Sequence, residues 1–293
     1  MVELTDSVSV SVLVHSTSNL RLLNRFSKKT LISVFFIVCC FLFQLQAIAQ
    51  TCPTLDGFDQ SELKSGAVDW VPDGDTIHTS KGNRLRLLHI NAPETNATKP
   101  IAAEPMALQA KNELIRLIGE SKAIYWLNDK RIKDKYGREL ALVFNQAGDL
   151  INAQLVASGM AHILLIPPND LFWRCMTAAE KKARRQSKGI WNFKVFRAKR
   201  VRQAGSSKNA PLKANQGFQL LSGKITQIKQ TRNNRWLVLD DHLWVGIPNK
   251  NLELFAAEKI KFTQGKMVTL RGYVYHSYGK FRLKLKHPAM LLR

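Results

Sequence analysis

The chain has 293 residues, of which 45% are hydrophobic, so it is long enough for two small domains with their own cores. Lys and Arg total 44 against 22 Asp and Glu, which gives a formal charge of +22. Such an excess favours a polyanionic partner such as nucleic acid, because each cation that neutralises a phosphate releases a counterion. A charge that only serves solubility, or attraction to anionic lipid, is the alternative.

The first 49 residues have the pattern of a secretory signal. Four basic residues between positions 21 and 29 precede an apolar run at 31–45, and residues 47–49 read AIA, which predicts cleavage after Ala49. The run is shorter than the roughly 20 apolar residues of a membrane helix, so a retained anchor is the less favoured interpretation. We therefore expect a secreted or periplasmic protein with no membrane span after cleavage, most simply a monomer.

Four cysteines are present, and two of them leave with the predicted signal. The remaining pair, Cys52 and Cys175, indicates one disulfide that ties the new N-terminus to the body of an exported protein, with two unpaired thiols as the alternative. A structural zinc site built from four thiolates is excluded for the mature chain.

The apolar pattern then predicts a small α+β barrel. We expect strands at 68–77, 84–90, 123–127 and 140–144, and helices at 104–118, 150–158 and from about 171 to Gly189. Strands, a helix, further strands and further helices in this order are typical of a barrel and not of a doubly wound sheet.

A basic linker without apolar periodicity is predicted at 193–216, after an N-terminal segment at 50–66 and a first domain at 67–192. A second domain follows at 217–293, with strands at 218–228, 235–239, 243–247, 267–276 and 280–286 and a short helix at 252–259. Five strands with a helix after the third predict an OB-like barrel, a fold often used on single-stranded nucleic acid.

This second domain should be separable and should add affinity for nucleic acid. Its candidate stacking rings are Tyr273, Tyr275, Tyr278 and Phe281, although aromatic residues in such a barrel are equally often part of an ordinary core or surface.

Three polar clusters lie in the first domain. They are "DGDT" at 73–76, "RLLHINAPET" at 86–95 and "DKYGRE" at 134–139. Carboxylate oxygens suit a hard cation such as calcium, two arginines suit the oxygens of a phosphoryl group, and a glutamate beside them suits a general base. Each cluster alone is weak evidence, because charged turns of this kind are common.

Together and in this order, the clusters resemble the staphylococcal nuclease (thermonuclease) family. The resemblance covers about residues 68–192 and rests also on "DKYGRELALVF" and on the closing "AEKKARRQSKGIWN". It implies an OB-type five-stranded barrel with packed helices, and calcium-dependent cleavage of phosphodiester bonds in DNA and RNA.

The resemblance also implies roles for individual residues. The calcium ligands would be Asp75, Asn91 and the backbone carbonyl of Ala92. The phosphate-binding arginines would be Arg86 and Arg138, and the general base would be Glu94. The residues that contact the phosphate end of the nucleotide would be Lys135 and Tyr136.

Two departures from the family pattern bear on these roles. Asn91 stands where the family usually has a second aspartate, which keeps an oxygen ligand but loses a charge, so we expect a weaker calcium site. Leu164 and Ile166 stand where tyrosines usually pack against the base, so stacking there should be reduced.

The sequence therefore favours a calcium-dependent nuclease that acts on DNA or RNA. A catalytically weak or inactive nucleic-acid-binding protein built on the same barrels is the alternative. Four residues that the family uses for metal binding and catalysis are all present, however: Asp75, Arg86, Glu94 and Arg138. Two further residues have structural interpretations: His89 is expected to be a packed or surface residue, and Trp191 a core or lid residue at the end of the barrel.

Overall fold

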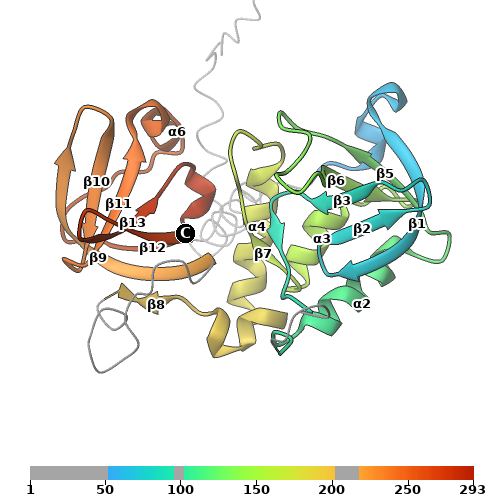
Figure 1. Ribbon diagram of the computed structural model, residues 1–293, viewed down its shortest axis with the longest axis horizontal. Helices are drawn as coiled ribbons and strands as arrows, with labels where there is room; N and C mark the ends of the chain where they lie inside the picture. Colours follow the sequence, from blue (N-terminus) through green and yellow to red (C-terminus); the bar gives the residue numbers. More distant parts are fainter. Residues whose placement is uncertain (1–51, 96–101, 202–217) are drawn as a thin grey trace, which may run out of the picture. The chain divides into compact units, whose positions relative to one another are not determined.

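The computed structural model describes residues 52–95, 102–201 and 218–293, all within the compact unit Gln50–Arg293 (Figure 1). The predicted signal at 1–49 and most of the predicted linker lie outside the described residues. None of the described helices has the length and apolar character needed to cross a membrane.

The first barrel closes from five strands in the order β1-β2-β3-β6-β5. The strands are β1 (Lys64–Asp73), β2 (Thr76–Thr79), β3 (Arg84–Leu87), β5 (Ala123–Leu127) and β6 (Glu139–Asn145). All neighbours are antiparallel except β3 and β6, which pair in parallel. Two short strands outside the barrel, β4 (Ile90–Asn91) and β7 (His162–Ile163), pair with each other.

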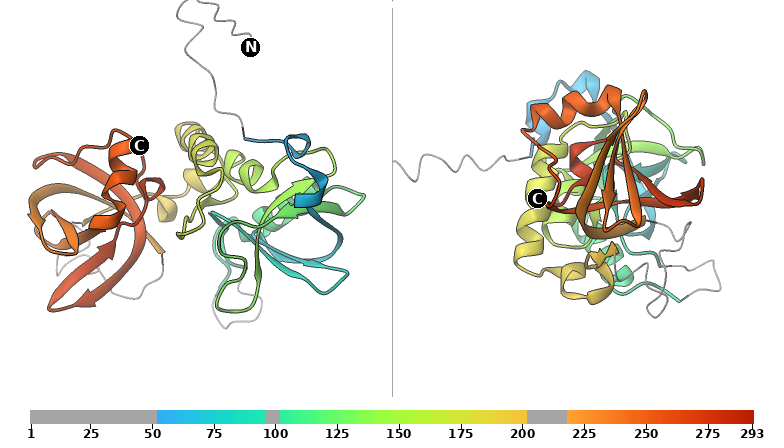
Figure 2. Two further views of the ribbon diagram at one scale, coloured as in Figure 1. Left: turned by 90° about the horizontal axis from the view of Figure 1, so that it is seen from above. Right: turned by 90° about the vertical axis from the view of Figure 1, so that its left-hand side faces the viewer.

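Three helices cover this barrel: α2 (Ala107–Ile118), α3 (Ile151–Ala157) and α4 (Trp173–Arg185). Helix α3 packs against both β6 and α4, as the two further views show (Figure 2). Shorter 3-10 turns are η3 (Leu55–Gly57), η4 (Gln60–Glu62), η5 (Gly189–Asn192), η6 (Lys194–Phe196), η7 (Asn249–Asn251) and η8 (Pro288–Met290).

Three predicted elements differ from the structure for local backbone reasons. The strand expected at 68–77 is divided between β1 and β2 by the turn at Gly74 and Asp75. The strand expected at 84–90 ends at Leu87, because His89 has a φ of 64°, which no extended strand contains. Met106, with a φ of 70°, delays the start of α2 to Ala107.

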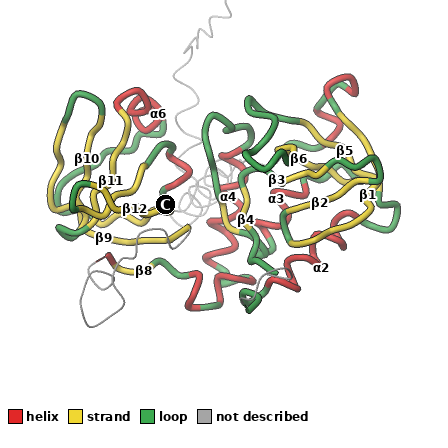
Figure 3. Tube along the Cα trace, viewed as in Figure 1, coloured by secondary structure: helices red, strands yellow, loops and turns green. Residues whose placement is uncertain are grey.

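The second barrel has the same strand order as the first (Figure 3). Its strands are β9 (Phe218–Gln230), β10 (Asn234–Leu239), β11 (Leu243–Pro248), β12 (Met267–Ser277) and β13 (Lys280–Lys284), with α6 (Leu252–Ala257) after the third. Strand β9 pairs with both β10 and β12 and so closes the barrel, and the third and fifth strands again pair in parallel. Both predicted OB-type barrels are therefore confirmed.

A buried ion pair joins the two barrels. Arg271 of β12 and Glu180 of α4 are 1% and 2% exposed, and two hydrogen bonds link them, one of them 2.5 Å long. Both side chains also bind the backbone of Ile163 in β7: Glu180 accepts from its N–H at 2.8 Å, and Arg271 donates to its carbonyl at 2.9 Å. This buried contact does not fit the expectation that the second domain is separable from the first, because separation would leave both charges without their partner.

The start of the predicted linker is also ordered. Strand β8 (Lys199–Arg200) pairs in parallel with β9, and Val201 is fully buried in the core of the second barrel. The sequence pattern conceals this, because a single apolar side chain among basic neighbours carries no periodicity.

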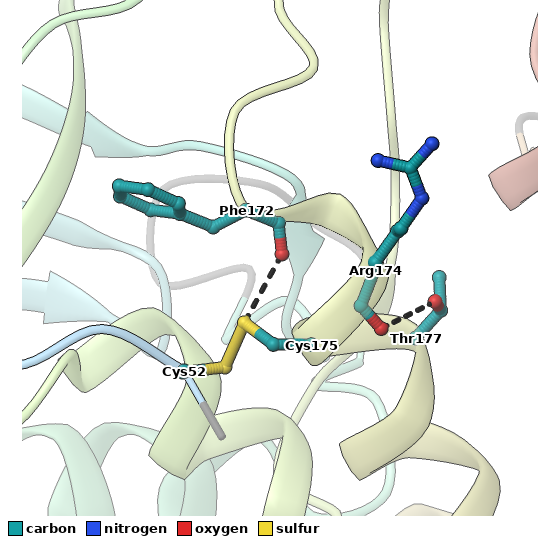
Figure 4. Close-up of a disulfide and its surroundings, with 5 residues drawn as sticks. All are labelled: Cys52, Phe172, Arg174, Cys175 and Thr177. Carbon is teal, nitrogen blue, oxygen red and sulfur yellow. Dashed lines mark hydrogen bonds between the residues drawn. A yellow bond between two sulfur atoms is a disulfide. The ribbon is translucent and has the colours of Figure 1, made fainter. Parts of the chain in front are cut away.

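The disulfide expected from the sequence is present (Figure 4). It joins Cys52, at the start of the described chain, to Cys175 in the first turn of α4, across 123 residues. The segment after Cys52 is therefore tied to the helix that carries Glu180.

Replacing Arg271 with Met should lower the free energy of unfolding by about 3–5 kcal/mol, because it leaves Glu180 charged and buried without its partner. Chemical denaturation measures this. The matched control is Arg174→Met, since Arg174 pairs with Glu258 on the surface at 2.9 Å and should contribute at most about 1 kcal/mol. Equal costs for the two variants would show that the buried pair does not hold the interface.

Candidate active site

The turn between β1 and β2 places a buried carboxylate at the open end of the first barrel. Asp75 is 4% exposed, and its backbone N–H donates to Asp73 Oδ1 at 3.1 Å, which fixes the turn. Gly74 allows close packing here, because a Cβ at this position would lie 2.7 Å from the Cβ atoms of both Ala92 and Ala110. The turn therefore packs directly against the segment after β4.

Arg86 on β3 connects this turn to β4. Its Nη2 forms an ion pair with Asp75 Oδ2 at 2.9 Å and donates to Asn91 Oδ1 at 3.3 Å. Its Nη1 donates to the carbonyls of Leu87 and Ile90 at 2.8 and 2.9 Å. The guanidinium is thus held in one orientation by four acceptors.

The bend that brings β4 back to Arg86 depends on a buried amide. Asn152 of α3 is fully buried, and its Nδ2 donates to the carbonyls of Leu88 and Ala141 while its Oδ1 accepts from the Val143 N–H. Its three hydrogen bonds therefore tie the backbone at Leu88, next to His89, to strand β6. Sequence reasoning missed this residue, because an Asn inside an amphipathic helix gives no signal of its own.

The electrostatics at Asp75 favour added positive charge. Burial raises the pKa of Asp75 to about 7, even though Arg86 and the Ala92 N–H, which donates to Oδ2 at 2.9 Å, both lower it. Asp73 and Glu94 raise it further. One guanidinium therefore does not fully offset the loss of hydration of this buried carboxylate.

The donor atoms available for a metal are all oxygens. Asp75 offers a carboxylate and Asn91 an amide oxygen, and the Ala92 carbonyl is near enough to accept from Asn91 Nδ2 at 3.4 Å. Oxygen-only sets suit calcium or magnesium and not zinc. Within the described ranges, no three acidic, His or Cys side chains cluster as a metal site would require. The ligand atoms are therefore of the type that a hard cation prefers, but only one of the three residues, Asp75, has a side chain that can carry a negative charge.

The loop between β5 and β6 presents a second arginine. Arg138 Nε donates to Asp134 Oδ2 at 2.8 Å, and Asp134 Oδ1 accepts from the backbone N–H groups of Tyr136 and Arg138. This pairing leaves the two terminal nitrogens of Arg138 available to a ligand. Asp134 is an orienting residue within the "DKYGRE" cluster to which sequence reasoning gave no role, although its i, i+4 spacing to Arg138 was visible.

The predicted residues form two groups. Asp75, Arg86, Asn91 and Ala92 are joined by direct bonds, whereas Arg138, Lys135 and Tyr136 lie on the second loop. Glu94 is exposed, and its backbone N–H donates to Glu104 Oε2 at 3.0 Å.

Tyr273, from β12 of the second barrel, lies near both groups. Burial raises the pKa of its hydroxyl, and Arg86, Lys135, Tyr136 and Glu94 all act on it electrostatically. Residues of both groups therefore lie within electrostatic range of one side chain of the second barrel.

Two other residues have structural roles. His89 is buried in the bend after β3, and burial lowers its pKa to about 4, so it is neutral and packed. Trp191 is buried in a small cluster with Ala183 and Ile190, which makes it a core residue.

Leu164 and Ile166, at the positions of the expected family tyrosines, line a cavity that the second barrel completes.

The first domain is thus an OB-type barrel with a buried carboxylate–arginine pair, neighbouring oxygen donors and a second arginine oriented on the loop between β5 and β6. Comparison with known proteins specifies the family. Residues 84–193 match the family model described as staphylococcal nuclease homologue. The chain is 33% identical over 132 residues to a thermonuclease of Staphylococcus intermedius, which covers 44% of this chain and 76% of that protein.

A thermonuclease of Staphylococcus hyicus is 30% identical over 140 residues, which is 46% of this chain and 80% of that protein. Endonuclease YhcR of Bacillus subtilis (strain 168) is 33% identical over 137 residues, and the match spans 43% of this chain but only 11% of that protein. The chain belongs to the staphylococcal nuclease family through its first barrel, and a second OB-like barrel follows.

Replacing Gly74 with Ala should destabilise the protein by about 1–3 kcal/mol, because the new methyl group overpacks the contact with Ala92 and Ala110. Thermal or chemical denaturation measures the cost. Gly57→Ala is the control, since a Cβ there has no neighbour within 4 Å among the described residues, and its effect should stay within about 0.5 kcal/mol. An equally mild Gly74→Ala would mean that the turn is not tightly packed.

Proposed function

We propose that this protein is a calcium-dependent nuclease that hydrolyses phosphodiester bonds in DNA or RNA. The observation that carries the proposal is the buried Asp75–Arg86 pair with the oxygens of Asn91 and Ala92 in the first barrel, together with a second, oriented arginine on the loop between β5 and β6. Family membership supports the same reaction class.

In this mechanism the terminal nitrogens of Arg138 bind the scissile phosphate, oriented by Asp134 as a rigid fork. Glu94, exposed beside Asp75, accepts a proton from the attacking water. Lys135 and Tyr136 flank Arg138 on the same loop and bind the phosphate end of the nucleotide; the Lys135 ammonium lies 4.8 Å from the Tyr136 ring.

Arg86, the other arginine expected to bind phosphate, has a positioning role in this structure. Because four internal acceptors hold it, it positions Asp75 and β4 relative to each other. Calcium, held by Asp75, Asn91 and the Ala92 carbonyl, would supply positive charge to the phosphoryl oxygens. The neutral Asn91 makes this site weak, which is compatible with surroundings rich in calcium.

We further propose that the protein is exported, to the periplasm or out of the cell. The signal-like pattern at 1–49 and the Cys52–Cys175 disulfide support this localisation, because disulfides persist in oxidising compartments. A protein that binds nucleic acid without cleaving it is the second candidate, favoured by the internal use of both terminal nitrogens of Arg86.

Purified protein without residues 1–49 should cleave plasmid DNA and single-stranded DNA or RNA in calcium, and chelator should abolish the cleavage. The physical reason is that calcium held by these oxygen donors would supply the positive charge that stabilises the phosphoryl oxygens. Full cleavage in excess chelator at the same pH would refute the metal dependence. Binding without cleavage in either condition would favour the second candidate.

Replacing Arg138 with Lys should lower kcat/KM about 100-fold, equivalent to about 2.7 kcal/mol, because an ammonium cannot donate two parallel hydrogen bonds while paired with Asp134. Steady-state cleavage of a short oligonucleotide measures the loss. The control is Arg116→Lys on α2, whose arginine pairs with Glu113 on the surface and should leave kcat/KM unchanged. If Arg138→Lys keeps normal turnover, Arg138 supplies only charge.

Replacing Asn91 with Asp should lower the calcium concentration for half-maximal activity roughly tenfold, because it adds a charged oxygen ligand beside Asp75. The control is Asn233→Asp, which adds the same charge at an exposed position of the second barrel. A half-saturation concentration that stays constant or rises in Asn91→Asp would show that this side chain is not a ligand.

A further inference from the structure

Strand β13 of the second barrel carries a row of cations on its outer side. Lys280, Arg282 and Lys284 alternate with Phe281 and Leu283, which pack toward the barrel core. The alternation continues past the strand, where Leu285 is buried and Lys286 is exposed. Because alternate residues of a strand repeat every 6.6 Å or so, the row places four positive charges at regular intervals.

Aromatic rings lie between these cations. The Lys280 ammonium is 3.8 Å from the Trp244 ring, the Arg282 guanidinium is 4.9 Å from Trp236, and the Lys284 ammonium is 5.8 Å from Tyr275. We call this surface, made of the four cations together with Trp236, Trp244, Tyr275 and Tyr278, the β13 track.

Two features suit the β13 track to ligand binding. Tyr278, at the tip of the β12–β13 turn, is 86% exposed, and the Arg282 guanidinium lies 5.1 Å from its ring. Trp236 lies flat over Gly246 on the neighbouring strand, where a Cβ would be 2.9 Å from its ring, so that ring is held rigidly. The ammonium of a lysine that covers a ring can move to bind a phosphate, and the face of the ring is then open to stack on a base.

The track leads toward the candidate active site. Lys284, Lys286 and Tyr275 line a cavity of about 310 Å³ with Phe218 and Tyr273. The Phe218 ring stacks on His162 at 5.0 Å, and His162 pairs with Asn91 across β4 and β7. Tyr273 lines the same cavity, and its ring lies 5.6 Å from that of Phe218. Cations and rings therefore continue from the second barrel to the site.

We propose that the β13 track binds single-stranded nucleic acid and directs the strand to the site at the end of the first barrel. The regularly spaced cations neutralise successive phosphates, and the rings that they cover stack on unpaired bases. A duplex keeps its bases inside and an anionic membrane has none, so neither ligand can use both the cations and the rings. Of the four rings that the sequence predicted for stacking, Tyr273, Tyr275 and Tyr278 contribute to this binding, whereas Phe281 packs against the core. The delivery of the strand to a cleavage site rests on the proposed function, whereas the binding of the strand by the β13 track does not.

The test measures binding of a fluorescent single-stranded 25-mer in chelator, over a salt series. Lys280→Ala with Lys284→Ala should weaken binding and make the salt dependence shallower by about 1.4 in log–log slope, since two phosphates are no longer neutralised. The charge-matched control is Lys181→Ala with Lys182→Ala, on α4, which should change the slope by less than half as much. Equal effects from both pairs would overturn the proposal in favour of general attraction by net charge.

The rings are tested at the same salt. Trp244→Ala should weaken binding at least about fivefold, and Tyr278→Asn, which suits the positive φ of 48° at that exposed tip, should weaken it without a folding defect. Duplex of the same sequence and anionic vesicles serve as competitors. Unchanged affinity in both ring variants, or displacement of the strand by either competitor as efficiently as by unlabelled single strand, would overturn the assignment to single strands.

Cleavage separates delivery from binding. In calcium, the track variants should raise KM for long single strands and leave kcat/KM for a dinucleotide unchanged. If the wild type binds the 25-mer but cleaves nothing, the proposed function fails and the track stands. If it cleaves both substrates and the track variants bind and cleave long strands normally, the track fails and the proposed function stands.

Discussion

The buried ion pair between Glu180 and Arg271 is the constraint on which the arrangement of this protein depends. Neither charge reaches water, so each needs the other, and both also hold the backbone of Ile163. Ile163 pairs with Ile90 on β4, the strand that ends in Asn91. One ion pair thus links the second barrel, helix α4 and the strand that bears a candidate metal ligand.

The order of the predicted elements was sufficient to predict a small barrel for each domain, whereas the five-stranded OB type of the first barrel came from the resemblance to the family. The elements that differed are those governed by single backbone positions. His89 and Met106 adopt positive φ, which only a few per cent of residues other than glycine do, so the local sequence gives little signal for the end of β3 or the late start of α2. The connection between the barrels was equally hidden, since Arg271 and Glu180 are separated by 91 residues.

The candidate site was partly visible in the sequence for a different reason. Motifs at 73–76, 86–95 and 134–139 hold the reactive groups on short segments, so residue type and order identified them. Their roles toward calcium and phosphate stay predictions. The supporting residues were not visible: Asn152 acts through three backbone groups, and Asp134 acts through Arg138. Trp236 and Trp244 were overlooked because the pattern of a strand does not tell which outward rings meet cations on its neighbours.

The link between Cys52 and Cys175 has a consequence for the cell that makes this protein. Cys175 lies on the same helix as Glu180, so the cross-link braces the element on which the joint between the barrels depends. Thiols stay reduced in an ordinary cytosol, and the brace forms only after the chain reaches oxidising surroundings. Under the proposed nuclease function and export, the most stable form of the protein would therefore arise only outside the compartment that holds the producer's own genome and transcripts.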